Sequence, residues 1–147
     1  MKLSWRNVPV PEAYLVALSA GGAFEFLQPH TITPARGTSR IGGALVLLAG
    51  LGLAVWSVAT AGDAVIDRPT VLLVSGPYRR SRNPMYLAWT SIALGVALLA
   101  NSVWLLGMVP LAFLYLHLVE IPREEARLDA VFGEQYLAYK RRVRRYL

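Results

Sequence analysis

The sequence contains no cysteine and only two histidines among its 147 residues. The lack of cysteine excludes a disulfide framework, a thiolate nucleophile and a zinc site built on thiolates. His30 and His117 lie far apart in the chain, so a histidine-rich metal centre is not expected either. We therefore predict that the protein holds no metal.

The short motifs of common soluble enzymes are also absent. The chain has no G-x-G-x-x-G that could follow a strand, no phosphate-binding P-loop, no H-E-x-x-H and no G-x-S-x-G. By motif, nothing indicates a soluble dinucleotide-binding, NTP-binding, metalloprotease or serine hydrolase domain.

Charged residues are scarce. They make up 16% of the chain, whereas hydrophobic residues make up 55% and the mean hydropathy is +0.43. A soluble domain carries about 25% charged residues. From Ile41 to Ala61 no residue is charged, and a helix of that length spans about 31 Å, close to the hydrocarbon core of a bilayer. These features predict an integral membrane protein.

The apolar segments predict an all-α fold with about four transmembrane helices in a single domain, 1–147. Only Asn101 and Ser102 separate the last two segments, which must then form an antiparallel hairpin. Pro110 is expected to kink the fourth helix, which should end near Glu120. The predicted spans are approximately 13–28, 41–61, 85–100 and 103–119, followed by a C-terminal helical cap at 122–146.

The basic residues predict the orientation and the partner. The formal net charge is +6, but lysine and arginine flank the apolar segments, which fits an anionic lipid surface better than nucleic acid. With four spans, nearly all of them share one side, and the other side has only Arg36 and Arg40. This asymmetry predicts that both termini are cytoplasmic, in what would be a bacterial inner membrane.

The C-terminal cap shows apolar and aromatic residues at three- and four-residue spacing, among them Leu128, Phe132, Tyr136 and Tyr139. Gly133 is expected to break or bend this helix. The basic run 140–145 should then lie on the polar face or at the lipid headgroups.

Two charged clusters stand at the ends of apolar segments. The first cluster is basic and comprises Arg79, Arg80 and Arg82, which lie between Tyr78 and Tyr86. The second cluster is acidic. Charged residues close to the membrane are either topological anchors or parts of a functional site. The hairpin would bring both clusters to the same end of the molecule. The acidic cluster comprises Glu120, Glu124 and Glu125.

Two motifs carry a resemblance to a known family. G-P-Y-R-x-x-R-N-P-M-Y begins at Gly76, and E-E-x-x-L-x-x-x-F-G-E-x-Y-x-x-Y-x-x-x-V begins at Glu124. In this order, with a short apolar hairpin between them, they resemble the isoprenylcysteine carboxyl methyltransferase family of membrane enzymes. The resemblance implies methyl transfer from S-adenosylmethionine, held at the cytosolic face, to a lipid-linked acceptor from the bilayer.

The resemblance also implies which residues form the site. A guanidinium such as Arg82 can hold the cofactor carboxylate in two hydrogen bonds, and a carboxylate such as Glu125 can accept from the ribose or pair with the ammonium. Tyrosine rings can stack on adenine or face the sulfonium. Catalysis would be mainly positioning, with Arg82 and Glu125 as the catalytic pair. The implied cofactor-binding residues are Tyr78, Arg82, Asn83, Pro84, Tyr86, Glu124, Glu125, Tyr136 and Tyr139. The implied acceptor-binding residues are Arg79, Arg123 and Trp89.

The chain departs from the family pattern at two positions. Asn83 stands where histidine is frequent, and Glu120 stands where eukaryotic members carry arginine, which reverses a charge near the expected acceptor pocket. The acceptor therefore stays open between a carboxylate, a thiol and an amine, and the oligomeric state is also open. The alternatives are an NADPH-dependent membrane reductase of the sterol reductase type and a non-enzymatic protein that binds anionic lipid.

Overall fold

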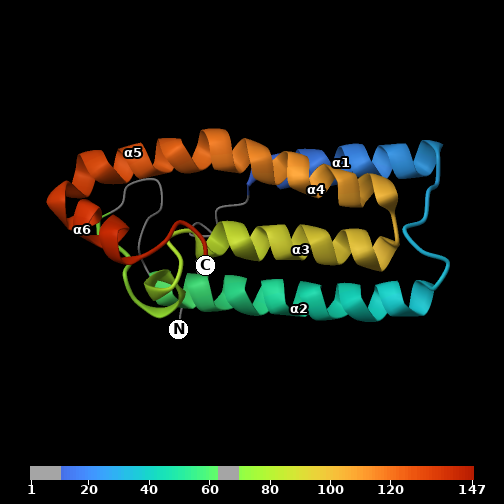
Figure 1. The fold of residues 1–147 in the computed structure, drawn as a ribbon, viewed down its shortest axis with the longest axis horizontal. Helices are drawn as coiled ribbons and strands as arrows, with labels where there is room; N and C mark the ends of the chain where they lie inside the picture. Colours follow the sequence, from blue (N-terminus) through green and yellow to red (C-terminus); the bar gives the residue numbers. More distant parts are fainter. Residues whose placement is uncertain (1–10, 63–69) are drawn as a thin grey trace.

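The computed structural model describes residues 11–62 and 70–147. This part of the chain is helical and has no strand beyond one isolated bridge between Thr31 and Ser102, which confirms the all-α prediction. Figure 1 shows long helices side by side, with short segments gathered at one end. The elements are α1 (Glu12–Leu27), α2 (Arg36–Ala61), the 3₁₀ turn η2 (Gly76–Arg79), α3 (Pro84–Ala100), α4 (Val103–Tyr115), the π-helical turn η3 (Leu116–Glu120), α5 (Ile121–Phe132) and α6 (Glu134–Arg142).

The helices pack as two antiparallel pairs, and the hairpin between α3 and α4 connects one pair to the other. α2 lies along α3, and α1 lies along α4 (Figure 1). The hairpin between α3 and α4 turns at Asn101, which adopts a left-handed backbone with φ 54°. As predicted, α3 and α4 are antiparallel, so the start of α3 and the end of α4 lie at the same end of the molecule.

Glycine allows the close approach of α2 and α3. A Cβ atom on Gly43 would lie 2.7 Å from the backbone nitrogen of Leu99, and one on Gly95 would lie 2.7 Å from that of Leu47. Gly50 meets α3 in the same way. Small residues at such spacing let helix backbones pack without intervening side chains. Gly50 therefore serves packing within one chain.

Polar groups near the hairpin turn explain an acidic residue in an apolar helix. The Ser102 hydroxyl donates to Glu25 Oε2 at 2.6 Å, and the Asn101 amide donates to the Thr33 carbonyl at 2.8 Å. Trp104 Nε1 donates to the Gln28 carbonyl at 2.7 Å. Glu25 thus ties α1 to the turn far from the charged clusters.

Two helices are long and apolar enough to cross a membrane. They are α2, with 26 residues, and the continuous helix Val103–Phe132, with 30 residues. Large apolar side chains on α2, such as Ile41 and Leu45, are more than half exposed, as a lipid-facing surface requires. α3 is apolar but shorter. Four complete spans stay a prediction.

Two helix boundaries differ from those that the sequence predicts. The fourth helix does not end near Glu120: the Ile121 N–H donates to the Leu116 carbonyl, and this π turn leads directly into α5. Pro122 has no N–H and cannot make the usual helical hydrogen bond. The wider π turn directly before it accommodates this loss within a continuous helix. α2 begins at Arg36 rather than at residue 41. The charged residues Arg36 and Arg40 lie in its first turns, because a charged side chain alone does not prevent a helix from starting.

The C-terminal cap is not one helix to residue 146. Gly133, with φ 50°, separates α5 from α6, which confirms the predicted break. α6 ends at Arg142, and Val143 is extended. The last residues therefore leave the helix and turn back toward the start of α3 (Figure 1).

Candidate functional site

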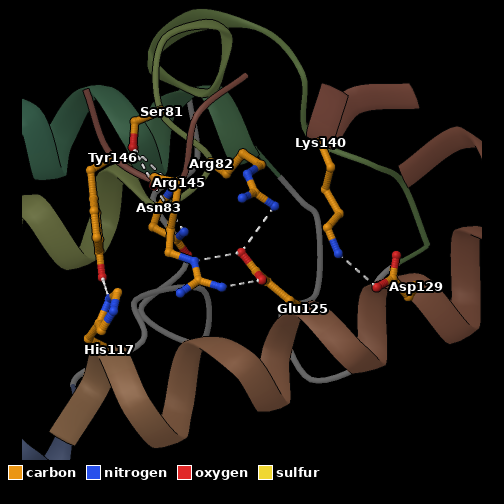
Figure 2. Close-up of polar contacts among 9 residues, drawn as sticks. All are labelled: Ser81, Arg82, Asn83, His117, Glu125, Asp129, Lys140, Arg145 and Tyr146. Atoms are coloured by element: carbon orange, nitrogen blue, oxygen red, sulfur yellow. Dashed lines mark hydrogen bonds and ion pairs between the residues drawn. The ribbon is translucent and has the colours of Figure 1, made fainter. Parts of the chain in front are cut away.

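Three segments meet at the end of the molecule where α3 starts. They are the segment 76–83, the helix α5, and α6 with the C-terminal segment 143–147. Figure 2 shows that side chains from all three point toward one another. The two motifs of the predicted site are therefore in contact in the folded chain.

Glu125 stands at the centre of this contact. Its Oε1 lies 3.0 Å from Arg82 Nη1. Arg145 binds the same carboxylate with both ends of its guanidinium fork, at 3.1 Å from Nε to Oε1 and 2.7 Å from Nη2 to Oε2. The side chains of Arg82 and Glu125 are both only 11% exposed. A buried carboxylate is thus held between two arginines, as Figure 2 shows.

Arg82 keeps unused hydrogen-bonding capacity. Its Nε is buried and makes no hydrogen bond with the described residues, and its Nη1 has only the ion pair with Glu125. Buried donors without an acceptor are costly and call for a partner. The site has two cations around one anion, so an anionic ligand would complete it.

The C-terminal segment is held against the start of α3 by its backbone. The Arg82 N–H donates to the Arg144 carbonyl at 2.9 Å. The Ser81 hydroxyl and the Asn83 amide both donate to the Arg145 carbonyl, at 3.2 and 3.1 Å. Tyr146 extends this attachment, since its hydroxyl shares a hydrogen bond of 2.7 Å with His117 Nδ1.

Tyrosines of α6 pack beside the ion cluster. Tyr136 is buried, and its ring lies 6.1 Å from that of Tyr139. Tyr139 donates to the Tyr78 carbonyl at 2.6 Å. Burial raises the pKa of Tyr78 to about 12 and that of Tyr136 to about 12, so both stay phenols at neutral pH. They can donate hydrogen bonds and offer ring faces, but they do not act as bases.

Two further predicted residues form a second contact between the motifs. Tyr86 in α3 donates to Glu124 Oε2 in α5 at 2.8 Å. Pro84 is buried in the first turn of α3, where a missing N–H is tolerated. Of the nine residues predicted for the cofactor, seven lie on the three segments that meet here, and Pro84 and Tyr86 lie at the start of α3.

The structure does not bring the predicted acceptor residues into this cluster. Arg79 is exposed and forms no ion pair within the part of the chain that the structure describes. Arg123 is exposed and pairs with Glu120 at 3.4 Å, one turn away on the same helix. Trp89 packs against the core formed by α1, α3 and α4.

Sequence reasoning missed Arg145. The basic run 140–145 was expected on the polar face or at the headgroups, but α6 ends before Arg145, and the extended backbone directs this side chain to Glu125. Lys140 likewise pairs with Asp129 at 3.0 Å. No spacing rule identifies a residue that lies beyond the end of a helix. The only available signal was that arginines outnumber glutamates in the two motifs, so that one buried glutamate could pair with more than one arginine.

A cleft of about 730 Å³ lies between α1 and α4. Its walls are mainly apolar, Tyr86 forms part of them, and Glu12 and Glu120 are its acidic residues. Tyr115 also lines it and donates to Glu120 Oε1 at 3.0 Å. Because Tyr86 also binds Glu124, one side chain connects the cleft with the ion cluster.

The fold and the site together define a class: an all-α protein with membrane-compatible helices in which a buried cluster of charged side chains joins the two motifs. The model of the phospholipid methyltransferase family matches residues 38–135, and the chain belongs to this family. That family lies in the clan of isoprenylcysteine carboxyl methyltransferase-like membrane enzymes, which confirms the resemblance. The matched region contains Arg82 and Glu125 but ends before Arg145.

A relative in a bacterium matches a smaller part. An uncharacterized protein of Haemophilus influenzae is 41% identical over 64 residues, which are 43% of this chain and 100% of the relative. Neither the reductase nor the non-enzymatic alternative gains support from these comparisons.

Proposed function

We propose that the protein is an S-adenosylmethionine-dependent methyltransferase that acts at the membrane on an amphipathic or lipid-linked acceptor. The observation that carries this proposal is the contact of Arg82 with Glu125, which joins the two family motifs in one buried ion cluster. Membership of a methyltransferase family supports the reaction class.

The residues present fit the cofactor. The buried guanidinium of Arg82, whose Nε has no hydrogen-bond partner among the described residues, suits the carboxylate of the amino acid end. Glu125 suits the ammonium or the ribose hydroxyls, and the ring faces of Tyr78 and Tyr136 suit adenine or the sulfonium. The bound cofactor would supply an electrophilic methyl group. The protein would hold donor and acceptor in line and exclude water.

The cleft between α1 and α4 fits an acceptor with an apolar tail. Its acidic residues, Glu12 and Glu120, would attract a protonated amine, accept a hydrogen bond from a neutral one and repel a carboxylate. Among the three acceptor classes that the sequence leaves open, we therefore favour an amine-bearing amphiphile. Tyr86, shared between the cleft and Glu124, would mark the boundary of acceptor and cofactor.

The placement in the membrane belongs to the same proposal. Four spans with both termini in the cytoplasm would put the pocket at the cytosolic face, where the cofactor is dissolved. The cleft would then open toward the bilayer, from which a lipid-linked acceptor can enter. A bacterial inner membrane would suit this arrangement.

Binding tests the proposal most directly. The purified protein in nanodiscs should bind S-adenosylhomocysteine with a micromolar Kd by calorimetry. NADPH should not compete. A protein that binds NADPH instead, or that binds no nucleoside ligand in nanodiscs and several detergents, would overturn the proposal.

A further inference from the structure

Arg145 is the partner of Glu125 that the family motifs do not contain. Its fork occupies both oxygens of the carboxylate, at 3.1 and 2.7 Å, while Arg82 touches only Oε1. With Arg145 in place, Glu125 has little capacity left for another cationic or hydroxyl group. The proposed function, however, requires Glu125 to bind the cofactor.

The two arginines differ in how easily they can leave Glu125. The Arg82 side chain is 11% exposed and lies in the turn before α3, surrounded by protein. The Arg145 side chain is 30% exposed and stands close to the chain end. Moving Arg145 into water therefore costs less than moving Arg82, because more of its solvation is already present.

The backbone of Arg145 need not move when its side chain does. Ser81 and Asn83 hold the Arg145 carbonyl, and Arg82 holds that of Arg144. These contacts do not involve the guanidinium. A change of side-chain rotamer is therefore enough to free Glu125, and the C-terminal segment can stay attached.

The charge balance favours an exchange. Arg82, Glu125 and Arg145 together carry one net positive charge. If the guanidinium of Arg145 leaves and a ligand ammonium enters, Glu125 keeps two cationic partners, and the ligand carboxylate can accept a hydrogen bond from the unpaired Nε of Arg82.

We propose that Arg145 is an exchangeable placeholder: it neutralises Glu125 in the free protein and gives way to the ammonium end of the cofactor. This inference rests on the proposed function. Arg145 would then determine part of the cofactor affinity. It would also keep the buried carboxylate of Glu125 paired in the free protein.

Substitution of Arg145 tests the placeholder. Arg145→Ala and Arg145→Met should bind S-adenosylhomocysteine about fivefold more tightly than the unchanged protein, because no side chain must be displaced first. Arg145→Lys, which keeps the charge but loses the fork, should lie in between. Arg141→Ala is the matched control: Arg141 is exposed on α6 and lies outside the site, so the affinity of this variant should equal that of the unchanged protein.

Thermal unfolding without ligand gives a second readout. Arg145→Ala should lower the Tm of the free protein, since Glu125 loses one partner, and should increase the rise in Tm that S-adenosylhomocysteine produces. Weaker or unchanged binding by both the alanine and the methionine variant would overturn the placeholder and leave the proposed function standing. Failure of the unchanged protein to bind would overturn the proposed function and, with it, the placeholder.

Discussion

Tyr139 in α6 donates a hydrogen bond of 2.6 Å to the carbonyl oxygen of Tyr78 in η2. This contact joins the two family motifs without any charge. It also places the ring of Tyr139 at the turn that leads to Arg82. A hydrogen bond between uncharged groups therefore holds the site together in addition to the ion pairs.

Tyr139→Phe should destabilise the pocket. The substitution keeps the buried ring and removes only the donor, so a loss of about 1 kcal/mol in the free energy of unfolding is expected. Denaturant titration in detergent micelles would measure it. Tyr115→Phe, which removes the bond to Glu120 at the cleft, is the control at an exposed position and should change stability less. Equal effects of the two substitutions would contradict a structural role for the Tyr139 bond.

Glu125 should matter more for stability than Arg82. Glu125→Gln leaves the buried Arg82 without a compensating charge, a loss of about 3 kcal/mol. Arg82→Gln leaves Glu125 still bound by the fork of Arg145 and should cost less. Both substitutions should abolish micromolar binding of S-adenosylhomocysteine, while circular dichroism stays helical.

Arg80→Gln supplies the control for this comparison, because Arg80 is exposed in the same turn. It should leave both stability and ligand binding unchanged. If Arg80→Gln reduced binding as strongly as Arg82→Gln, the arginines would act collectively as a basic surface, and the pocket assignment would be wrong.

The packing of α2 on α3 predicts an effect far from the pocket. Gly95→Ala brings a Cβ to 2.7 Å from the Leu47 backbone, so the two helices must move apart. We expect a lower Tm and partial loss of ligand binding. Gly52→Ala is the matched control on α2, because its Cβ would meet nothing within 4 Å. A Gly52→Ala variant as unstable as Gly95→Ala would contradict close contact as the cause, because alanine has a higher helix propensity than glycine at both positions.

The parts of the structure that the sequence predicted rest on local or pairwise rules. Asn101 and Ser102 leave too short a link for anything but a hairpin, and the hairpin alone brings Arg82 and Glu125 to one end. Gly133 ends α5 because its positive φ suits glycine. The motifs then indicated a site on the segments that do meet.

What the sequence did not predict depends on contacts between distant segments. The continuation of the fourth helix through a π turn follows from how the helix accommodates Pro122, which periodicity alone does not reveal. Hydrogen bonds from Ser81 and Asn83 to the Arg145 carbonyl set the inward direction of Arg145. Both donors lie more than sixty positions before Arg145 in the chain. Such a contact leaves no repeat or spacing in the sequence.

Glu120 should decide which acceptor is methylated. The cleft places Glu120 beside Tyr115, and Glu12 lines the same cleft, so an amine-bearing amphiphile should be a better acceptor than a fatty acid of equal chain length. Glu120→Arg reverses the charge at this position and should lower kcat/KM for the amine about tenfold while raising it for the acid, because one attraction becomes a repulsion. Transfer of a labelled methyl group from S-adenosylmethionine to each amphiphile in nanodiscs would measure both. Glu134→Arg, an exposed charge reversal in α6, should leave the ratio unchanged. An unaltered preference in Glu120→Arg would place the acceptor outside this cleft.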